Sequence, residues 1–439
     1  MCCTGREAAG VNDVPDQLTA RGGPSPRDSA APTVFVMEAS GKAALPVIES
    51  MARAGFRVAA GSERRLNSGF FSRGCRERHV YPSTRFQKAA FQEWLLKFLR
   101  SRPIDMLFQL GHYGALAVNE IQDDVRRHTR IIMPSASSFL AAYEKIPTMK
   151  TAMAAGVPIP DSWFPAEHPG GLEGVLPQIQ RWPVLIKPSV GVGARGITWC
   201  YNADEIRSAY DRLTAEHGEC YLQDFIPPGG MQYKVDMLMD EHRSVLAAIA
   251  YGKTRMYPPD GGSSVLNFSA DRPDVIEYSR MMLVALDWLG FCDFDYVVDP
   301  RDDVAKLMEI NPRFPESFNM GISVGIDFPL MMYRMAHGEP VEAVLDYPKN
   351  RFLRFLPADI LWFLRVSNKQ RFSTWPSWFQ FRKDTSYQLL RARDPGPIIG
   401  YLLENLAALF NPALLRDRLR LSSGAKKKAA DPAAKRSTS

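Results

Sequence analysis

The sequence has little of what a membrane-spanning, disulfide-linked or zinc-finger protein needs. None of its apolar runs reaches the ~18–20 residues of a helix that crosses a bilayer. Its 439 residues include 6 cysteines and no Cys-x-x-Cys pair, a pattern that favours free thiols in a reducing compartment. The first thirty residues are polar and lack the apolar segment of a signal peptide. We therefore expect a cytoplasmic globular protein.

The charge balance also excludes a class of partner. The net charge is +6, and part of the excess lies in a tail that contains Lys426, Lys427, Lys428, Lys435 and Arg436. Nucleic-acid binding needs a clustered basic face, which this distribution does not predict. With 46% hydrophobic and 23% charged residues, the chain has the composition of a globular protein. At this length, two or three domains are expected.

The first ordered elements predict a parallel sheet. A buried strand over 34–37 is followed by a helix over 43–54 and a second strand over 56–60. Changes in composition then divide the chain into five segments: 1–31, a disordered N-terminal segment; 32–135, a small α/β domain; 136–340, a larger mixed domain; 341–422, an extension rich in Trp and Arg; and 423–439, a basic disordered tail.

Further along the chain, three more elements are expected between the two domains. The pattern predicts a helix over 119–127, a strand over 131–133 and one continuous helix over 138–155. Gly156 closes that last helix, since glycine is common just after a helix end.

The run Glu309-Ile310-Asn311-Pro312-Arg313 is the most informative motif. It follows a strand-like stretch, and residues i and i+2 of a strand point to the same face. Glu309 and Asn311 would therefore present two oxygen ligands side by side, as Mg²⁺ prefers when phosphates complete its shell. Pro312 ends the strand. Arg313 would then hold a phosphoryl oxygen beside the metal. The motif points to nucleotide chemistry.

A glycine-rich loop over 191–196 has the spacing GxGxxG. As a dinucleotide fingerprint it is weak, because residues 197–200 predict a strand where that site needs a helix. A hairpin is the alternative, in which Ser189 and free backbone N–H groups fold over phosphates. Lys187, directly before the loop, would add a cation. A surface hairpin with a solvated lysine has about equal weight for this loop taken alone.

Taken in order, these residues resemble the ATP-grasp superfamily, in particular a carboxylate–amine ligase or carbamoyl-phosphate-synthase-like ATP-binding domain. The resemblance runs from about residue 34 to about residue 340. It implies an α/β and α+β fold: a pre-ATP-grasp Rossmann-like domain over 32–135, then a two-subdomain ATP-grasp domain over 136–340. The lid subdomain would lie at about 150–222, and residues 341–422 would form a C-terminal helical extension.

The resemblance also implies roles for particular residues, with ATP and Mg²⁺ (or Mn²⁺) as cofactors. Arg313 would hold the γ-phosphate or an acyl phosphate, and Arg255 would bind a carboxylate or the transferring phosphate, although an ordinary loop is the alternative for Arg255. The remaining implied contacts fall into three groups: phosphate contacts from Lys145, Lys187, Ser189, Gly193 and Gly196; adenine contacts from the hinge residues Gln223, Asp224 and Ile226; and magnesium ligands Asp295, Glu309 and Asn311.

The implied reaction joins a small-molecule carboxylate to an amine. Transfer of the ATP γ-phosphoryl group gives the carboxylate a good leaving group, and an amine then attacks the acyl phosphate. Three alternatives stay open. One is carboxyphosphate or carbamoyl phosphate chemistry, although a full synthase has two ATP-grasp units. The second is a non-catalytic nucleotide-binding regulatory protein. The third is a Rossmann oxidoreductase, from GxGxxG alone.

The C-terminal region has two interpretations. Residues 398–410 predict an apolar helix, and Arg416, Arg418 and Arg420 follow it. A basic amphipathic helix lies on a membrane surface in some proteins, which would make this one peripheral to a membrane. A helix packed on the catalytic domain is the simpler interpretation. The sequence names neither the acid, nor the amine, nor the oligomeric state.

Overall fold

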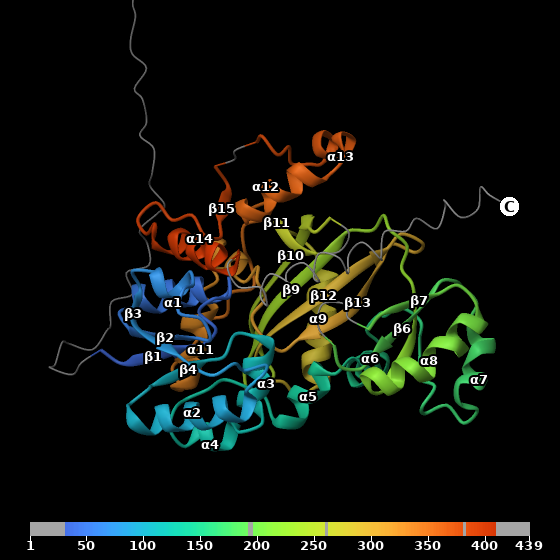
Figure 1. Ribbon diagram of the computed structural model, residues 1–439, viewed down its shortest axis with the longest axis horizontal. Coiled ribbons are helices and arrows are strands. Elements are labelled where there is room, and N and C mark those ends of the chain that lie inside the picture. Colours follow the sequence, from blue (N-terminus) through green and yellow to red (C-terminus); the bar gives the residue numbers. More distant parts are fainter. Residues whose placement is uncertain (1–30, 192–195, 260–261, 381–382, 410–439) are drawn as a thin grey trace, which may run out of the picture. The chain divides into compact units, whose positions relative to one another are not determined.

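The computed structural model describes residues 31–191, 196–259, 262–380 and 383–409 (Figure 1). Residues 1–31 form one unit and residues 32–439 another, and the fold given below is that of the second unit. It contains three β-sheets with helices packed against them. Among the described residues, no helix combines the length and the apolar character that crossing a membrane requires.

The first sheet is parallel, with the strand order β3-β2-β1-β4. The central strands β1 and β4 and most of β2 are apolar and buried, as parallel strands covered on both faces are, whereas the edge strand β3 is largely polar. The strands are β1 (Thr33–Val36), β2 (Arg57–Ser62), β3 (Cys75–Val80) and β4 (Met106–Phe108). The helices around it are α1 (Ala44–Arg53), α2 (Lys88–Ser101), α3 (His112–Asn119) and α4 (Gln122–Arg126), with a 3-10 turn η1 (Gly69–Phe71).

Two expectations for this part of the chain were wrong. The helix over 119–127 is instead the end of α3 and the short α4, separated at Glu120 and Ile121. The strand over 131–133 is reduced to one bridge, between Arg130 and Met106. Residues 131–133 are apolar because they pack in the core, and burial alone does not distinguish strand from loop.

The second sheet is antiparallel, with the order β5-β8-β6-β7. Its strands are β5 (Ser162–Trp163), β6 (Val184–Pro188), β7 (Thr198–Cys200) and β8 (Cys220–Asp224). A cluster of apolar side chains joins it to α7 (Gly171–Val175), η2 (Leu176–Gln178) and α8 (Ala203–His217). Asn202 caps α8 by accepting a hydrogen bond from the Glu205 backbone, as its position predicts. We call this group of elements the lid.

The glycine-rich loop joins β6 to β7, and these two strands pair antiparallel. It therefore lies in a hairpin and opens no helix. A Rossmann dinucleotide site needs a strand, a glycine turn and then a helix, so this geometry removes the oxidoreductase alternative. Gly193 lies outside the described residues.

The third sheet is the largest, with the order β13-β12-β9-β10-β11-β14-β15. Neighbouring strands are antiparallel except β14 and β15. The strands are β9 (Gln232–Met239), β10 (Val245–Tyr257), β11 (Ser263–Ser269), β12 (Gly290–Asp299), β13 (Val304–Asn311), β14 (Phe352–Arg354) and β15 (Thr385–Tyr387). Between and after them lie α9 (Pro273–Ala285), α10 (Asn319–Ser323), α11 (Phe328–Ala336), α12 (Leu356–Arg365), α13 (Asn368–Ser373) and α14 (Gly396–Leu409).

The segment after residue 340 is more than a helical extension. Residues 352–354 pair with β11, and residues 385–387 pair with β14, so this segment adds two strands to the large sheet. Each strand has only three residues, which is too short for an alternating pattern to be read from sequence. In Figure 1 these strands and the helices α12 and α14 are orange to red.

The expected helix over 138–155 is two helices, α5 (Ala136–Tyr143) and α6 (Lys145–Ala155). The break is at Glu144, whose ψ of 133° is extended. Apolar residues are present on both sides of it, so the periodicity gave no sign of the break. The break makes Lys145 the first residue of a helix. Both helices contact β13, which brings this turn to the edge of the large sheet.

Candidate active site

Four polar side chains face one another across β12 and β13. In the register of these two antiparallel strands, Asp293 lies opposite Asn311 and Asp295 lies opposite Glu309. Residues two apart share a face of a strand, so all four lie on one side of the sheet. The structure thus brings together the three residues predicted as magnesium ligands, Asp295, Glu309 and Asn311.

Two lysines from the neighbouring strands neutralise the β12 carboxylates. Lys234 Nζ donates to Asp293 Oδ2 at 2.8 Å and to Asp295 Oδ2 at 2.7 Å. Lys253 Nζ donates to Asp295 Oδ1 at 2.6 Å. Burial raises the pKa of Asp293 above its usual range. Burial also opposes ionisation of Asp295, but the two lysines outweigh it and hold its pKa below its usual range.

The amide of Asn311 has a fixed orientation. Its Nδ2 donates to Asp293 Oδ2 at 3.0 Å and to Asp295 Oδ2 at 3.2 Å. Ionised carboxylates only accept hydrogen bonds, so the nitrogen must face them and the oxygen must face away. That oxygen, Oδ1, accepts from Arg313 Nη2 at 3.0 Å. Asn311 therefore offers its oxygen on the side where Arg313 lies.

A cavity of about 50 Å³ adjoins these residues. Glu309 faces it and makes no hydrogen bond or ion pair with any residue that the structure describes, so its carboxylate is available to a ligand. The cavity joins three separate parts of the chain: the start of α3, the turn between α5 and α6 with Gly191 of the lid, and the end of β13. Its lining is His112, Ala142, Tyr143, Lys145, Thr148, Gly191, Glu309, Ile310, Asn311, Pro312 and Arg313.

His112 and Tyr143 are site residues that the sequence reasoning missed. The two rings stack with centroids 4.4 Å apart, and Tyr143 Oη lies 2.6 Å from His112 Nε2. Burial, then the charges of Arg313 and Lys145, lower the pKa of His112 to about 4. The imidazole is thus neutral at neutral pH. One signal was available, because His112 comes just after a strand of a parallel sheet, where ligands commonly bind.

Lys145 ties the helix α6 to the lid. Its backbone N–H donates to the Ser189 carbonyl at 2.8 Å, and its Nζ donates to the Gly191 carbonyl at 2.9 Å. The structure therefore brings Lys145 and Ser189 together, and of these two Lys145 lines the cavity. Their phosphate contacts stay a prediction. Gly196 has a φ of +77°, which favours glycine, and its nearest neighbours are His217 and Pro188.

Lys187 and Gln223 are buried together inside the lid. The Lys187 ammonium group donates to Gln223 Oε1, and Gln223 Nε2 donates to Ser162 Oγ at 2.9 Å. Ile226, three residues beyond Gln223, is buried as well. These side chains fix the hinge segment, whose residues 223 and 224 also pair with neighbouring strands of the lid sheet. Adenine contact by this segment stays a prediction.

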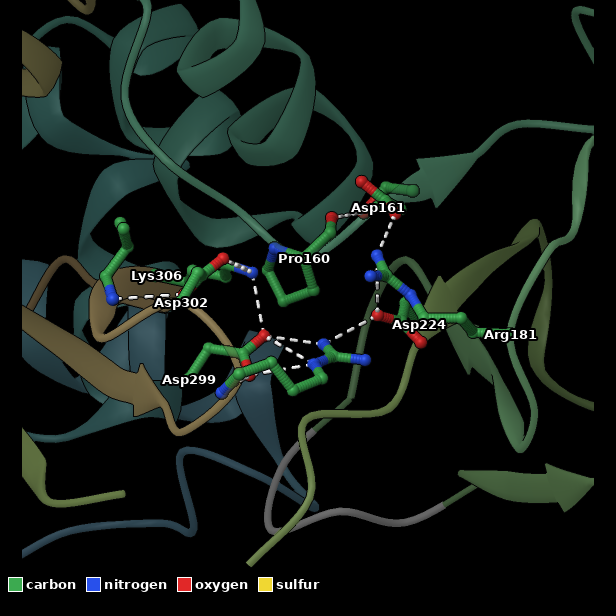
Figure 2. Close-up of polar contacts among 10 residues, drawn as sticks. Pro160, Asp161, Arg181, Asp224, Asp299, Asp302 and Lys306 are labelled. Atoms are coloured by element: carbon green, nitrogen blue, oxygen red, sulfur yellow. Dashed lines mark hydrogen bonds and ion pairs between the residues drawn. The ribbon is translucent and has the colours of Figure 1, made fainter. Parts of the chain in front are cut away.

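Asp224 is anchored by charges from two directions, as Figure 2 shows for the residues it labels. It is buried, and its Oδ2 lies 2.8 Å from Arg301 Nη2 and 3.5 Å from Arg181 Nη2. Arg301 also pairs with Asp299 at 2.5 Å, in the turn between β12 and β13. This network links the hinge to the large sheet. A second cavity, of about 520 Å³, borders Asp224, Arg181 and Asp161.

A family model described as "Carbamoyl-phosphate synthase L chain, ATP binding domain" matches residues 174–344. That range holds most of the lid, the hinge and the whole face of β12 and β13 described above. Residues 174–344 of this chain are therefore similar to an ATP-binding domain of that family.

Two curated relatives illustrate the similarity. The C-terminal section of the carbamoyl phosphate synthase large chain of Methanopyrus kandleri is 24% identical over 271 residues, which are 60% of this chain and 49% of that protein. The D-alanine–D-alanine ligase of Carboxydothermus hydrogenoformans is 27% identical over 233 residues, 48% of this chain and 72% of that enzyme. The chain thus spans about half the length of the first relative.

Solved structures show the same fold. The biotin carboxylase domain of the Hydrogenobacter thermophilus 2-oxoglutarate carboxylase, solved with MgADP and bicarbonate, aligns with a TM-score of 0.60 at 16% identity, covering 72% of this chain and 73% of that one. N5-carboxyaminoimidazole synthetase from Staphylococcus aureus aligns with a TM-score of 0.55 at 10% identity, covering 72% and 80%. The mixed ATP-grasp fold expected from the sequence is confirmed.

Arg255 lies apart from the predicted site residues that line the cavity. Its guanidinium is buried, and Nη1 donates to Asp359 Oδ1 at 3.0 Å and Oδ2 at 2.9 Å. Its Nη2 donates to the Pro376 carbonyl at 2.9 Å. Arg354 Nε also donates to Asp359, at 2.6 Å. These contacts hold α12 against the large sheet and leave Arg255 outside the cavity lining.

The donor set fits a hard cation at two of the three predicted positions. Glu309 carries a carboxylate with no partner among the described residues, and Asn311 presents an oriented amide oxygen, which are ligands that Mg²⁺ takes when phosphates complete its shell. Asp295 differs, because lysines hold both of its oxygens. No group of three or more His, Cys, Asp and Glu side chains in the described part of the chain is arranged to hold a metal alone.

Proposed function

We propose that this chain is an ATP-dependent ligase that activates a carboxylate as an acyl phosphate and joins it to an amine. The observation that carries the proposal is the cavity where Lys145, Glu309, Asn311 and Arg313 meet. Phosphoryl transfer from a metal-bound nucleotide requires cations for the phosphates and oxygen ligands for the metal. The cavity offers two cations, one free carboxylate and one oriented amide oxygen.

The chain's own residues account for the charge that develops. One carboxylate oxygen of the acid attacks the γ-phosphorus, the bond to the β–γ bridging oxygen breaks, and ADP leaves. Lys145 and Arg313 line the cavity and stabilise the phosphoryl oxygens. Mg²⁺ held by Glu309 and Asn311, with Asp295 beside them, or Mn²⁺ in its place, would supply further neutralisation of the triphosphate.

The second half of the reaction needs an amine and a place for its proton. The amine nitrogen attacks the acyl carbon, phosphate leaves with the former carboxylate oxygen, and the nitrogen loses one proton. His112 is neutral and faces the cavity, so it is suited to hydrogen-bond the incoming substrate. Lys187 and the backbone over 223–226 would hold the nucleotide from the lid side.

A second candidate is the formation of carboxyphosphate from bicarbonate. The match to a carbamoyl-phosphate synthase ATP-binding domain and the fold of biotin carboxylase favour it. The proposed ligase requires an organic acid for ADP release, whereas this alternative requires bicarbonate. A non-catalytic nucleotide-binding protein is disfavoured by the uncommitted Glu309 carboxylate, which a decayed site would have no reason to keep in place.

The proposal extends to compartment and partners. We propose small-molecule acids and amines as the substrates, and we do not propose nucleic acid as a partner. The described cysteines, Cys75, Cys200, Cys220 and Cys292, are free and buried, which suits a reducing compartment such as the cytoplasm. A peripheral contact with a membrane through the C-terminal region is also proposed.

The experiment is a coupled ADP-release screen of the full chain with pairs of carboxylic acids and amines, with and without bicarbonate. We expect release that depends on one acid–amine pair and on Mg²⁺. Glu309→Ala should abolish it, whereas Glu241→Ala, an exposed residue of the β9–β10 turn, should not. Release that needs bicarbonate alone would favour the second candidate. Nucleotide binding without turnover for any pair would favour a regulatory protein.

A further inference from the structure

The segment from α12 to α13 and onward to residue 380 carries a group of exposed apolar side chains. Leu364 is 69% exposed and Phe372 is 67% exposed, which is unusual for residues of this size. The exposed large apolar side chains of this segment are Ile360, Leu361, Leu364, Phe372, Trp375 and Phe379. We call them the apolar patch.

Aromatic contacts join two residues of the patch, and buried residues of α12 support it from the inner side. Phe372 stacks on Phe379 with centroids 6.4 Å apart, and Phe379 contacts Phe363 at 5.4 Å. On the inner side of α12, Asp359 and Trp362 are buried against the large sheet. The ion pairs of Asp359 with Arg255 and Arg354 therefore fix which face of α12 points outward.

The exposed charged residues of the segment over 356–380 have one sign. Arg365 and Lys369 are exposed and Arg371 is half-buried, whereas beyond this segment Lys383 is followed directly by the half-buried Asp384. The acid of residues 356–380 is Asp359, which is buried and paired. Surfaces that bind an anionic lipid headgroup layer combine aromatic and leucine side chains with cations and have no exposed acid. This segment has that composition.

The same charges argue against a second copy as the occupant. A symmetric dimer would place the patch against itself and bring Arg365 and Lys369 close to the partner's equivalent cations. No exposed acid of this segment would pair with them, and desolvated like charges are unfavourable. An anionic bilayer supplies both the apolar layer and the opposite charge.

We propose that the apolar patch and its flanking cations dock this protein on the surface of a membrane that contains anionic lipids. The side chains of α12 and α13 enter the boundary between headgroups and acyl chains, and Arg365 and Lys369 contact the headgroups. This proposal is independent of the proposed ligase activity, because none of the patch residues lines the cavity.

The experiment is co-sedimentation of the full chain with phosphatidylcholine vesicles that contain or lack phosphatidylglycerol. We expect binding only to the anionic vesicles. The apolar variant Leu364→Gln with Phe372→Gln keeps every cation, including those after residue 409, and should bind at least about tenfold more weakly. The basic variant Arg365→Gln with Lys369→Gln should weaken binding by a similar factor.

Matched controls replace exposed side chains of the same kinds elsewhere. The apolar control is the double variant Val80→Gln with Leu345→Gln, and the basic control is the double variant Arg127→Gln with Arg243→Gln. Both should bind the anionic vesicles as the unchanged chain does. Three outcomes would overturn the proposal: no binding to anionic vesicles, full binding by the apolar variant, or a dimer in solution that the apolar variant abolishes while vesicle binding is unaffected. Thermal unfolding of each variant verifies that it is folded.

Discussion

Asp293 Oδ2 accepts a hydrogen bond of 3.0 Å from Asn311 Nδ2, and this contact turns the Asn311 oxygen toward Arg313. Asp293 is thus a positioning residue for a predicted metal ligand. An amide in its place can donate or accept, so the orientation of Asn311 would depend on Asp295 and Arg313 alone and be held less firmly. We expect Asp293→Asn to lower Mg²⁺-dependent ADP release by about 10–100-fold, the usual effect of losing such support. Unchanged Mg²⁺ dependence in a folded variant would contradict this role.

Glu309 is predicted to act in the reaction and not in folding. Since its carboxylate has no partner among the described residues, Glu309→Gln should leave the unfolding temperature almost unchanged. Its effect on ADP release should be a loss of about 10²–10³-fold, comparable with removal of another group that stabilises transition-state charge. Steady-state rates and a thermal melt of the same sample test both parts. Glu241→Gln serves as the control, and a rate equal to that of the control would refute the assignment.

Arg255 is predicted to contribute to stability. It is buried against Asp359, and removing one partner of a buried pair costs about 3–5 kcal/mol. Because Arg354 still pairs with Asp359, Arg255→Met should fall near the lower end of that range. Denaturant unfolding measures the change in free energy, and ADP release measured under stabilising conditions should persist. If Arg255 instead contacted substrate, activity would be lost while stability was retained.

The pH dependence of stability should contain a contribution from His112. Its pKa is lowered from 6.5 to about 4, mainly by burial, so the unfolded chain takes up a proton first as the pH falls. The contribution of the neutral His112 to the free energy of unfolding is fully present above pH 6.5 and is lost as the pH falls toward 4. The loss is about 2 kcal/mol once solvent screening is allowed for. Unfolding of His112→Gln is measured across the same pH range, and its free energy of unfolding should fall less than that of the unchanged chain. Equal pH profiles would contradict the burial of a neutral imidazole.

Arg301 is predicted to position the hinge through Asp224. Its removal leaves a buried carboxylate whose remaining cation contact among the described residues is Arg181 at 3.5 Å, which should loosen the backbone over 223–226. Hydrogen bonds to charged groups are worth about 1.5–3 kcal/mol, so Arg301→Gln should raise the KM for ATP about tenfold with little change in kcat. Arg207→Gln, which removes exposed lid ion pairs, is the matched control. A fall in kcat at constant KM would contradict a positioning role.

The parts of the site that share one strand were predictable from the sequence. Glu309 and Asn311 are two residues apart, and strand periodicity alone places them on one face. The hairpin after Lys187 was also predictable, because residues 197–200 had strand character and no helical pattern. Asn202 as a helix cap follows from local chemistry of the same kind.

The parts that depend on contacts between distant segments were not predictable. Lys234 and Lys253 reach Asp295 only through the register of β9 and β10 with β12, which no local pattern encodes. His112 meets Tyr143 from another domain segment. Arg255 was expected at the substrate because of its charge. Its burial is set by Asp359, which is 104 residues away in the chain.

The central claim is that a carboxylate oxygen attacks the γ-phosphorus of ATP in this cavity. The most direct measurement uses an acid identified in the ADP-release screen, labelled with oxygen-18 in its carboxylate, and analyses the released phosphate by mass spectrometry. The account predicts ADP as the nucleotide product and one labelled oxygen in each phosphate that is released. AMP with pyrophosphate, or ADP with unlabelled phosphate, would contradict it.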